Sequence, residues 1–452
     1  MGVMVRIRKQ QHKLKRFMRF KYLSPVLTIV SVTLLLWTYK WVDIQDLLSS
    51  AEGKLPLVAV SGTKTLLMSA YLDRRSGQRK VRVLTVVLRN ETVEYRCLLC
   101  CQGQPYVSMG NSSIHFEHFG FPYGTADIKC PLPSGCEKPS HIAVTAAEAE
   151  DEGLVFLEVQ NQNIRNIFKH DFTVCFSTMF DFTNVLQLVQ SLEMLQLLGV
   201  SNVVIYKTSC SPDVQRILDY YTNTGLVEVI PWSISRYVNV SRGWLPEHGP
   251  GDLHYFGQIP VLNDCLYRYM YQTRYLALHD IDELIIPQTV KSWSQLLPKL
   301  ERKYGADLCF MFENTVFPNS VILPPPASRK TLSSLTNFSS TWQGVTGVNF
   351  LAHLYHGLNK AKQKQNFKII ISPRAVFSVT VHGVQRSKKR CVWVDRKTAI
   401  LHHTRPPPEM GLASVHLYYN SRLLHYSSRL IPAVSTVLRN TGFIPEDINK
   451  NL

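Results

Sequence analysis

The chain has 452 residues, enough for two or three domains, and its hydrophobic content of 45% is ordinary for a globular protein with a sizeable core. Its net charge of +17 is concentrated at one end, where residues 1–21 hold many lysines and arginines and no acid. Such a cluster is typical of nucleic-acid-binding tails, but the segment that follows it favours a membrane protein instead.

That segment, residues 22–41, is almost free of charge and rich in Val, Leu and Ile, with Tyr22 and Trp41 at its ends. About 20 apolar residues can cross a bilayer, and basic residues before them predict a cytoplasmic N-terminus. We expect a single-pass type II anchor, a short stem at 42–56 and a lumenal body. A cleaved signal peptide is the alternative, but the apolar run is long and no small-residue cleavage site follows it.

A lumenal body would carry N-glycans and disulfides. Four sequons provide glycosylation sites, at Asn90, Asn111, Asn239 and Asn337. Half of the ten cysteines cluster early in the body, at Cys97, Cys100, Cys101, Cys130 and Cys136. The cluster predicts disulfides; a zinc site at Cys97-x-x-Cys100 is the alternative, but it lacks a second matching Cys pair.

Residues 57–168 are predicted to form a small β-rich domain tied by these disulfides. The β-branched, apolar run 81–88 and the run 155–159 are typical of strands, and Gly and Pro punctuate the sequence between them, as at 120–124. The domain shows no catalytic constellation of its own.

From residue 172 the pattern changes to alternating strands and helices. We expect strands at 172–176, 202–206 and 226–230, and helices at 181–198 and 211–225. Gly199 is a helix stop signal, and Ser211-Pro212 is a helix start signal. Short links between these elements predict a parallel α/β unit, in which ligands bind at the carboxyl ends of the strands.

The long irregular segment 231–257 is rich in aromatic residues and favours a substrate loop. A helix is expected at 258–271, with Asn263 and Asp264 either on a solvated face or in a site. The remaining expected elements are a helix at 292–304, strands at 307–312, 367–371, 376–382 and 399–403, and a helix at 415–438.

The most informative stretch is His279–Pro287, in which Asp280 and Asp282 follow an apolar strand at 275–278. Two carboxylates at one strand end repel each other unless a cation lies between them. Mg²⁺ or Mn²⁺ completes its coordination with phosphate oxygens and would neutralise a diphosphate leaving group. The motif therefore predicts an enzyme that uses a nucleotide-sugar; the alternative is an acidic turn after a buried strand.

Several stretches together resemble glycosyltransferase family 92 over about residues 172–405. They are Val174–Phe176, Asn263–Leu266, His279–Glu283 with Pro287, Lys368–Pro373 leading to His382, and His402–Arg405. The last departs from the expected His-Tyr-Arg, because Thr404 stands in the Tyr position.

The resemblance implies a GT-A fold over residues 170–440, Mn²⁺, a nucleotide-sugar donor and inversion at the anomeric carbon. Members of the family are Golgi galactosyltransferases that use UDP-galactose, so the expected acceptor is a terminal sugar of glycoprotein glycans. In this fold Asp280 would bind the ribose, or the ion through water, and Asp282 would ligate the ion. A late histidine would complete the metal site, His403 in preference to His382, and Glu283 would hold the loop.

A GT-A enzyme also needs a base that takes the proton of the acceptor hydroxyl. Glu313 ends a predicted strand at the same sheet edge as Asp282 and is our candidate, with Asp252 as the alternative. Lys362, Lys364 and Lys368 could face phosphate, but we interpret them as a solvated basic stretch.

Other functions remain open from the sequence. A lectin or scaffold on an inactive transferase fold would be expected to lose Asp280, Asp282 or the late histidines, and this chain keeps them. A nucleic-acid or membrane-surface binder would depend on the basic tail. A two-metal phosphodiesterase would need more His and Asp neighbours than the motif supplies.

The topology generates the first testable prediction. Glycosidase treatment of the full-length protein from eukaryotic cells should lower its apparent mass, because a lumenal body would be N-glycosylated. A variant with all four sequon asparagines replaced by Gln should already run at the lower mass. An unchanged mass, with the tail protected from cytosolic protease, would indicate the reverse orientation.

Overall fold

The computed structural model of the protein describes residues 57–150, 153–164, 167–323, 326, 342–357, 366–407 and 417–445. The predicted tail, anchor and stem at 1–56 lie outside these residues, as do Asn337, Lys362 and Lys364. Within the described part of the chain, no helix combines the length and the apolar character needed to cross a membrane.

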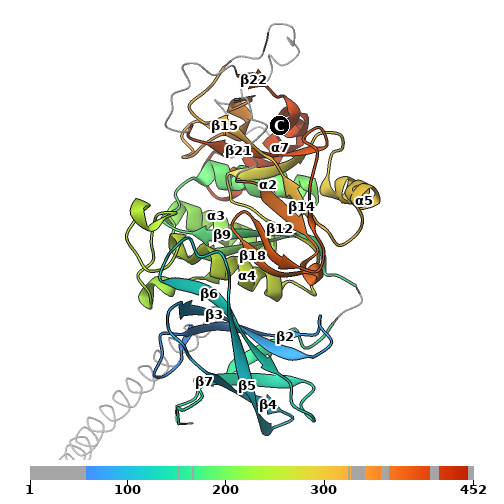
Figure 1. The fold of residues 1–452 in the computed structure, drawn as a ribbon. Helices are drawn as coiled ribbons and strands as arrows, with labels where there is room; N and C mark the ends of the chain where they lie inside the picture. The colour runs from blue at the N-terminus through green and yellow to red at the C-terminus, as the bar shows by residue number, and fades with distance from the viewer. Residues whose placement is uncertain are drawn as a thin grey trace, which may run out of the picture. The chain divides into compact units, whose positions relative to one another are not determined.

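The β-rich region forms a sheet that closes on itself (Figure 1). Its strands are β1 (Val58–Ala59), β2 (Leu66–Asp73), β3 (Lys80–Leu88), β4 (Tyr95–Cys101), β5 (Gln104–Ile114), β6 (Tyr123–Pro131), β7 (Pro139–Ala146) and β8 (Leu157–Gln160). Closure comes from β2, which pairs with β3 on one side and with β8 on the other. The predicted strands at 81–88 and 155–159 are thus β3 and β8.

Two disulfides tie this closed sheet, Cys97–Cys130 and Cys101–Cys136, which confirms the predicted disulfides. The alternative of a zinc site at Cys97 and Cys100 is wrong. Side chains alternate between the two faces of a strand, so Cys97 and Cys101 of β4 point into the core while Cys100 points the other way and stays unbonded.

The second region is a mixed α/β domain around a seven-stranded sheet. In sheet order its strands are β11 (Val227–Pro231), β10 (Asn202–Lys207), β9 (His170–Met179), β12 (Thr273–Leu278), β17 (Lys368–Ile371), β14 (Cys309–Phe312) and β20 (Cys391–Trp393). The first four are parallel, as the sequence predicted. β17 runs antiparallel between β12 and β14, and a disulfide links Cys309 to Cys391.

The helices are α2 (Val185–Leu198), α3 (Pro212–Asn223), α4 (Gln258–Arg268), α5 (Trp293–Tyr304) and α7 (Ser427–Asn440). Short 3₁₀ turns are η1 (Ile234–Arg236), η2 (Pro246–His248), η3 (Tyr255–Gly257), η5 (Phe350–Ala352), η6 (Pro373–Ala375) and η8 (Arg422–Tyr426).

Local signals explain where two of these helices begin and end. Ser211 caps α3 as predicted, and Gly199 ends α2 in the left-handed region with a φ of 102°. α2 begins later than predicted because Asn184 caps it by accepting from the backbone of Gln187. The last predicted helix also begins later, at Ser427, after the short strand β22 (Tyr418–Tyr419) and η8.

Alternation along the strands divides the core into two layers. Val203 and Ile205 of β10 face a core shared with α2, α3, α5 and α7, whereas Val204 and Tyr206 face α4. The core around α4 also contains residues of the closed sheet, among them Met68. The two regions therefore share the core around α4, and the closed sheet has a second core of its own.

A small three-stranded sheet, β13-β21-β15, brings residues 399–405 to the acidic motif (Figure 1). Its strands are β13 (Glu283–Pro287), β21 (Ala399–Arg405) and β15 (Asn314–Pro318). The antiparallel register places Glu283 opposite His403. Outside the sheets already described, β18 (Val376–Thr380) pairs with β19 (Gly383–Ser387), and β16 (Tyr355–His356) pairs with β22.

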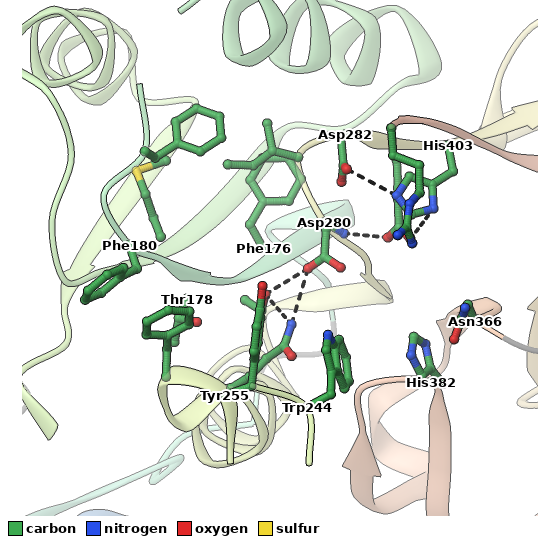
Figure 2. A pocket seen from close by; sticks show the side chains of 18 of the residues that line it. Phe176, Thr178, Phe180, Trp244, Tyr255, Asp280, Asp282, Asn366, His382 and His403 are labelled. Carbon is green, nitrogen blue, oxygen red and sulfur yellow. Dashed lines mark hydrogen bonds and ion pairs between the residues drawn. The ribbon is translucent and has the colours of Figure 1, made fainter. Parts of the chain in front are cut away.

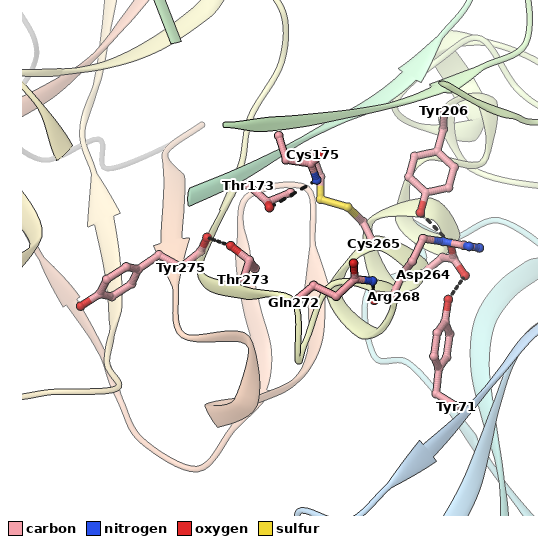
Figure 3. The surroundings of a disulfide bond; sticks show 11 residues. Tyr71, Thr173, Cys175, Tyr206, Asp264, Cys265, Arg268, Gln272, Thr273 and Tyr275 are labelled. Carbon is pink, nitrogen blue, oxygen red and sulfur yellow. Dashed lines mark hydrogen bonds and ion pairs between the residues drawn. A yellow bond between two sulfur atoms is a disulfide. The ribbon is translucent and has the colours of Figure 1, made fainter. Parts of the chain in front are cut away.

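The expectation that Asp264 is solvated or part of a site is wrong, because it is fully buried where the two regions meet. Its carboxylate accepts hydrogen bonds from Tyr71 of β2 at 2.7 Å and from Tyr206 of β10 at 2.6 Å (Figure 3). It also accepts one from Ser69 of β2. Arg268 pairs with it at 3.0 Å. One buried charge therefore joins the closed sheet to the α/β domain.

Asn263 is buried as well and serves the fold in a similar way. Its side-chain amide donates to the backbone of Ile259 and Val379, and its carbonyl accepts from the backbone N–H of Val379. Both polar residues look solvent-facing in sequence, but α4 is covered on both sides, by β18 and the parallel sheet and by the closed sheet.

The Asp264 contacts generate a stability prediction. Asp264→Ala should lower the free energy of unfolding by about 3–5 kcal/mol, because it leaves Arg268 without its buried partner and three hydroxyl groups without their acceptor. Chemical denaturation under non-reducing conditions measures the change. Asp219→Ala, an exposed carboxylate on α3, is the control and should stay within about 0.5 kcal/mol of the wild type. Equal stability of the two variants would show that Asp264 does not hold the regions together.

Candidate functional site

A pocket of about 800 Å³ opens at the carboxyl ends of β9 and β12. The chain leaves β9 toward β10 and β11 and then returns to form β12 on the other side of β9. Such a reversal of strand order leaves a crevice in which α/β sheets bind ligands. Residues after β9 and β12 line the pocket, together with residues of the 231–257 segment, β21 and His382 (Figure 2).

A buried cation holds the acidic motif. Lys368 is 3% exposed, and its ammonium lies 2.8 Å from Asp280 Oδ2 and 3.3 Å from Glu283 Oε2. It reaches them because β17 runs antiparallel beside β12, so the first residue of β17 is at the carboxyl edge of β12. The interpretation of Lys368 as part of a solvated basic stretch is therefore wrong.

Lys368, Asp280 and Glu283 shift one another's pKa values. Burial disfavours the ammonium of Lys368, but Asp280 and Glu283 outweigh burial and raise its pKa. Burial would raise the pKa of Asp280, but Lys368 overrides it and lowers the value to about 2. Burial raises the pKa of Glu283 to about 7 in spite of Lys368. Asp280 is thus an ionised carboxylate with a fixed counter-charge.

Neutral hydrogen bonds fix the other oxygen of Asp280. Its Oδ1 accepts from the Ser177 hydroxyl at 2.8 Å and from the Gln258 amide at 3.4 Å, and Gln258 also donates to Ser177 at 2.6 Å (Figure 2). The carboxylate of Glu283 accepts from the backbone N–H of Asp280 at 2.8 Å. The described contacts of Glu283 are those of a residue that holds the loop.

Asp282 and His403 stand together at the pocket surface (Figure 2). Asp282 Oδ2 lies 3.1 Å from His403 Nε2, and Glu283 Oε1 lies 3.4 Å from His403 Nδ1. Burial opposes a charge on His403, but the bond to Asp282 and the charge of Glu283 raise its pKa above the usual value. The side chain of Asp282 is 33% exposed, so it remains accessible to a ligand.

The donor set at Asp282 and His403 fits a divalent cation that takes its other ligands from substrate. One carboxylate and one imidazole converge there, and Mg²⁺ and Mn²⁺ sites in nucleotide enzymes commonly use few protein ligands with phosphate oxygens and water. No cluster of three or more metal-binding side chains occurs within the described residues. Asp280 is less available to such a cation than Asp282, because both of its oxygens are already bonded within the protein.

The second candidate histidine lies on another wall of the pocket. His382 stacks on Trp244 with ring centroids 5.5 Å apart and nearly parallel planes. Figure 2 shows it across the pocket from Asp282 and His403. Of the two histidines, the structure places His403 beside Asp282.

Neither candidate base lines the pocket within the described residues. Glu313 is near the predicted sheet edge, but β17 separates β14 from β12, and its carboxylate lies 3.8 Å from Arg396. Asp252 lies in the 231–257 segment, where its backbone bonds to Asn239 and Tyr123. The structure therefore does not bring either carboxylate to the pocket.

Sequence reasoning missed Ser177, Gln258 and the position of Lys368. Ser177 lies near the end of β9, and Gln258 begins α4. Ser177 could have been found from the sequence, because it is a polar residue near the carboxyl end of the first parallel strand. The acidic motif was expected at the same edge of the sheet. The contact of Lys368 with the motif depends on a pairing between strands far apart in sequence, and no local pattern predicts it.

The profile of glycosyltransferase family 92 matches residues 170–430. The β-1,4-galactosyltransferase galt-1 of Caenorhabditis elegans is 23% identical over 231 residues, which cover 48% of this chain and 50% of the relative. The galactan β-1,4-galactosyltransferase GALS2 of Arabidopsis thaliana is 24% identical over 192 residues, covering 42% of this chain and 33% of the relative. The matched part thus spans half or less of these relatives.

A solved structure of glucosyl-3-phosphoglycerate synthase from Mycobacterium tuberculosis, in complex with Mn²⁺, UDP and glucosyl-3-phosphoglycerate, aligns with 62% of this chain and 82% of its own. The identity is 11% and the TM-score is 0.21. A likeness this low supports no inference about the fold or the ligands of this chain.

The buried ammonium generates a third prediction. Lys368→Met should lower the free energy of unfolding by about 3–5 kcal/mol, because two neighbouring carboxylates lose the cation between them. Chemical denaturation at neutral pH measures the loss. Lys389→Met removes an ammonium that is half exposed and should change stability by less than about 0.5 kcal/mol. If Lys368→Met is as stable as the Lys389 variant, Lys368 does not compensate the motif.

Proposed function

The chain belongs to glycosyltransferase family 92, and from this premise we propose that it is an inverting, metal-dependent galactosyltransferase of GT-A type. It moves galactose from UDP-galactose to a terminal sugar of glycoprotein glycans. Two matched relatives named as β-1,4-galactosyltransferases support the choice of sugar. Inversion and the GT-A fold rest on the family resemblance.

The observation that carries the proposal is the pairing of Asp282 with His403 at the reversal of strand order, 3.1 Å apart and open to the pocket. These two residues would hold Mn²⁺, which supplies positive charge against the diphosphate of the donor. Arg405 also lines the pocket and is exposed, so its guanidinium is available to phosphate oxygens.

The remaining residues of the motif act by positioning. Lys368, Ser177 and Gln258 fix Asp280, so its carboxylate is held in one orientation toward the pocket before the donor binds. Asp280 would orient the donor, for which an ionised and immobile acceptor of hydrogen bonds suits a ribose hydroxyl. A preorganised site of this kind does not have to reorganise during the reaction.

We place this enzyme in the Golgi membrane as a single-pass type II protein with a lumenal catalytic domain. Four disulfides support an oxidising compartment. Asn90, Asn111 and Asn239 are exposed, as glycosylation requires. The basic tail and the apolar segment at 22–41 support the orientation.

A lumenal lectin or scaffold on an inactive fold is the second candidate. An inactive relative would have no need to keep the metal-binding pair of Asp282 and His403 or the buried support of Asp280. The retention of all these residues in one pocket favours the enzyme.

The proposal predicts donor choice and metal dependence. The purified full-length protein should transfer galactose from UDP-galactose, in the presence of Mn²⁺, in preference to glucose or N-acetylhexosamines from their UDP-sugars. Asp282→Asn should fold normally and lose about a hundredfold or more in turnover, since a strong electrostatic contact at the leaving group is worth about 3 kcal/mol. Radiolabelled sugar transfer to desialylated glycoproteins measures both.

The matched control is Asp213→Asn, a half-exposed carboxylate on α3, which should keep wild-type turnover. His403→Ala should weaken the dependence on Mn²⁺ more than His382→Ala does. Clear preference for another nucleotide-sugar would defeat the choice of galactose. Wild-type turnover by Asp282→Asn in the presence of a chelator would defeat the metal mechanism and return the lectin and hydrolase interpretations.

A further inference from the structure

One wall of the pocket is built from stacked aromatic rings. Trp244 lies between Tyr255 and His382, with ring centroids 5.0 Å and 5.5 Å away and planes within 20° of parallel. All three line the pocket, and Figure 2 shows them across it from Asp282 and His403. We call these three residues together with Phe119 the aromatic wall.

Phe119 comes from the closed sheet, on the connection between β5 and β6, yet it lines the same pocket. Its ring stacks on His254 at 4.1 Å and meets Trp244 edge-on at 5.8 Å. The β-rich domain therefore supplies part of the wall of a site whose other described residues come from the α/β domain.

The backbone that carries the wall is strained. Phe119, Tyr255 and Phe256 have positive φ angles of 53°, 25° and 53°. Bulky residues rarely adopt this region, which costs of order 1–3 kcal/mol each, and such strain concentrates at ligand sites. Three aromatic side chains beside one pocket are thus held in place at a cost to the stability of the fold.

Fixed contacts hold the Phe119 loop on the closed sheet and join it to the α/β domain. Arg89 donates to the backbone carbonyl of Phe121 at 2.6 Å and contacts the ring of His118 at 3.0 Å. The backbone N–H of Tyr123 donates to the carbonyl of Asp252, in the segment that carries Trp244. Arg89 therefore fixes the loop to its own domain, and a backbone hydrogen bond together with the ring contacts of Phe119 docks it on this segment.

The chemistry of the wall differs from that of the opposite side. Burial lowers the pKa of His382 to about 4 and that of His254 to about 3, so both rings are neutral at pH 7. The groups that would hold the cation and the diphosphate, Asp282, His403 and Arg405, are not part of the wall. A neutral ligand with an apolar face fits the wall better than a diphosphate does.

We propose that the aromatic wall is the acceptor subsite, where the terminal sugar of the glycan packs its C–H face against the rings, and that the β-rich domain determines acceptor choice through Phe119. The proposal rests on the proposed function and deepens it. The partial negative charge on aromatic faces attracts the C–H groups of a pyranose ring. The donor would occupy the side with Asp282 and His403, so the two sugars would meet between the walls.

The test separates acceptor binding from donor binding. Steady-state kinetics of the full-length protein with UDP-galactose, Mn²⁺ and β-1,4-galactan oligosaccharides or desialylated glycan should give a KM for the acceptor about fivefold to tenfold higher in Phe119→Ala. The KM for UDP-galactose should stay within twofold of the wild-type value. Phe119→Trp should recover most of the loss, since it restores a ring.

The matched control is Phe116→Ala. Phe116 is on the same connection but 89% exposed and does not line the pocket, so its removal should leave both KM values unchanged. An unchanged acceptor KM in Phe119→Ala, or equal increases for donor and acceptor, would overturn the subsite while galactose transfer still stands. A wild-type protein that transfers no sugar would instead overturn the proposed function itself.

Discussion

The site depends on the compensation of charge beneath its acidic motif. Glu283 accepts a hydrogen bond from the backbone of Asp280, and the ammonium of Lys368 lies beside both carboxylates and favours their ionised forms. That ammonium is itself almost fully buried, so the ammonium and the carboxylates compensate one another's charge. The antiparallel insertion of β17 beside β12 brings them together. The order of the strands in the sheet therefore determines which charges meet at the pocket.

Much of the α/β unit could be predicted from local signals. Ser211-Pro212 and Gly199 set helix ends that the structure reproduces, and the apolar runs became β9, β10, β11 and β12. The position of the acidic motif at the carboxyl end of a parallel strand follows from the same pattern. These features depend on residues that are close in sequence, so hydrophobic periodicity and helix-capping residues are enough to predict them.

Features that depend on long-range pairing could not be predicted in this way. Lys368 and Asp264 are charged, and charge in a sequence normally indicates solvent. Their burial follows from partners far away in the chain, β12 for Lys368 and the closed sheet for Asp264. Glu313 lies away from the pocket for a related reason, because β17, which comes from much later in the chain, lies between β14 and β12.

The β-rich domain is a structural part of the catalytic unit. Tyr71 and Ser69 bind the carboxylate of Asp264, and Met68 belongs to the core around α4. α4 in turn begins with Gln258, which bonds to Ser177 and Asp280 at the pocket. The closed sheet thus supports the site from below through one helix, in addition to the ring that it places in the pocket wall.

The disulfide between Cys175 and Cys265 joins β9 to α4 (Figure 3). Cys175 lies two residues before Ser177, which bonds to Gln258 of α4. Two of the three elements that fix Asp280 are therefore covalently linked only after the thiols have been oxidised. Protein made in a reducing cytosol would have to hold this geometry by noncovalent packing alone. A host that exports the chain to an oxidising compartment, with a disulfide isomerase to sort ten cysteines, is the appropriate source of material for biochemistry.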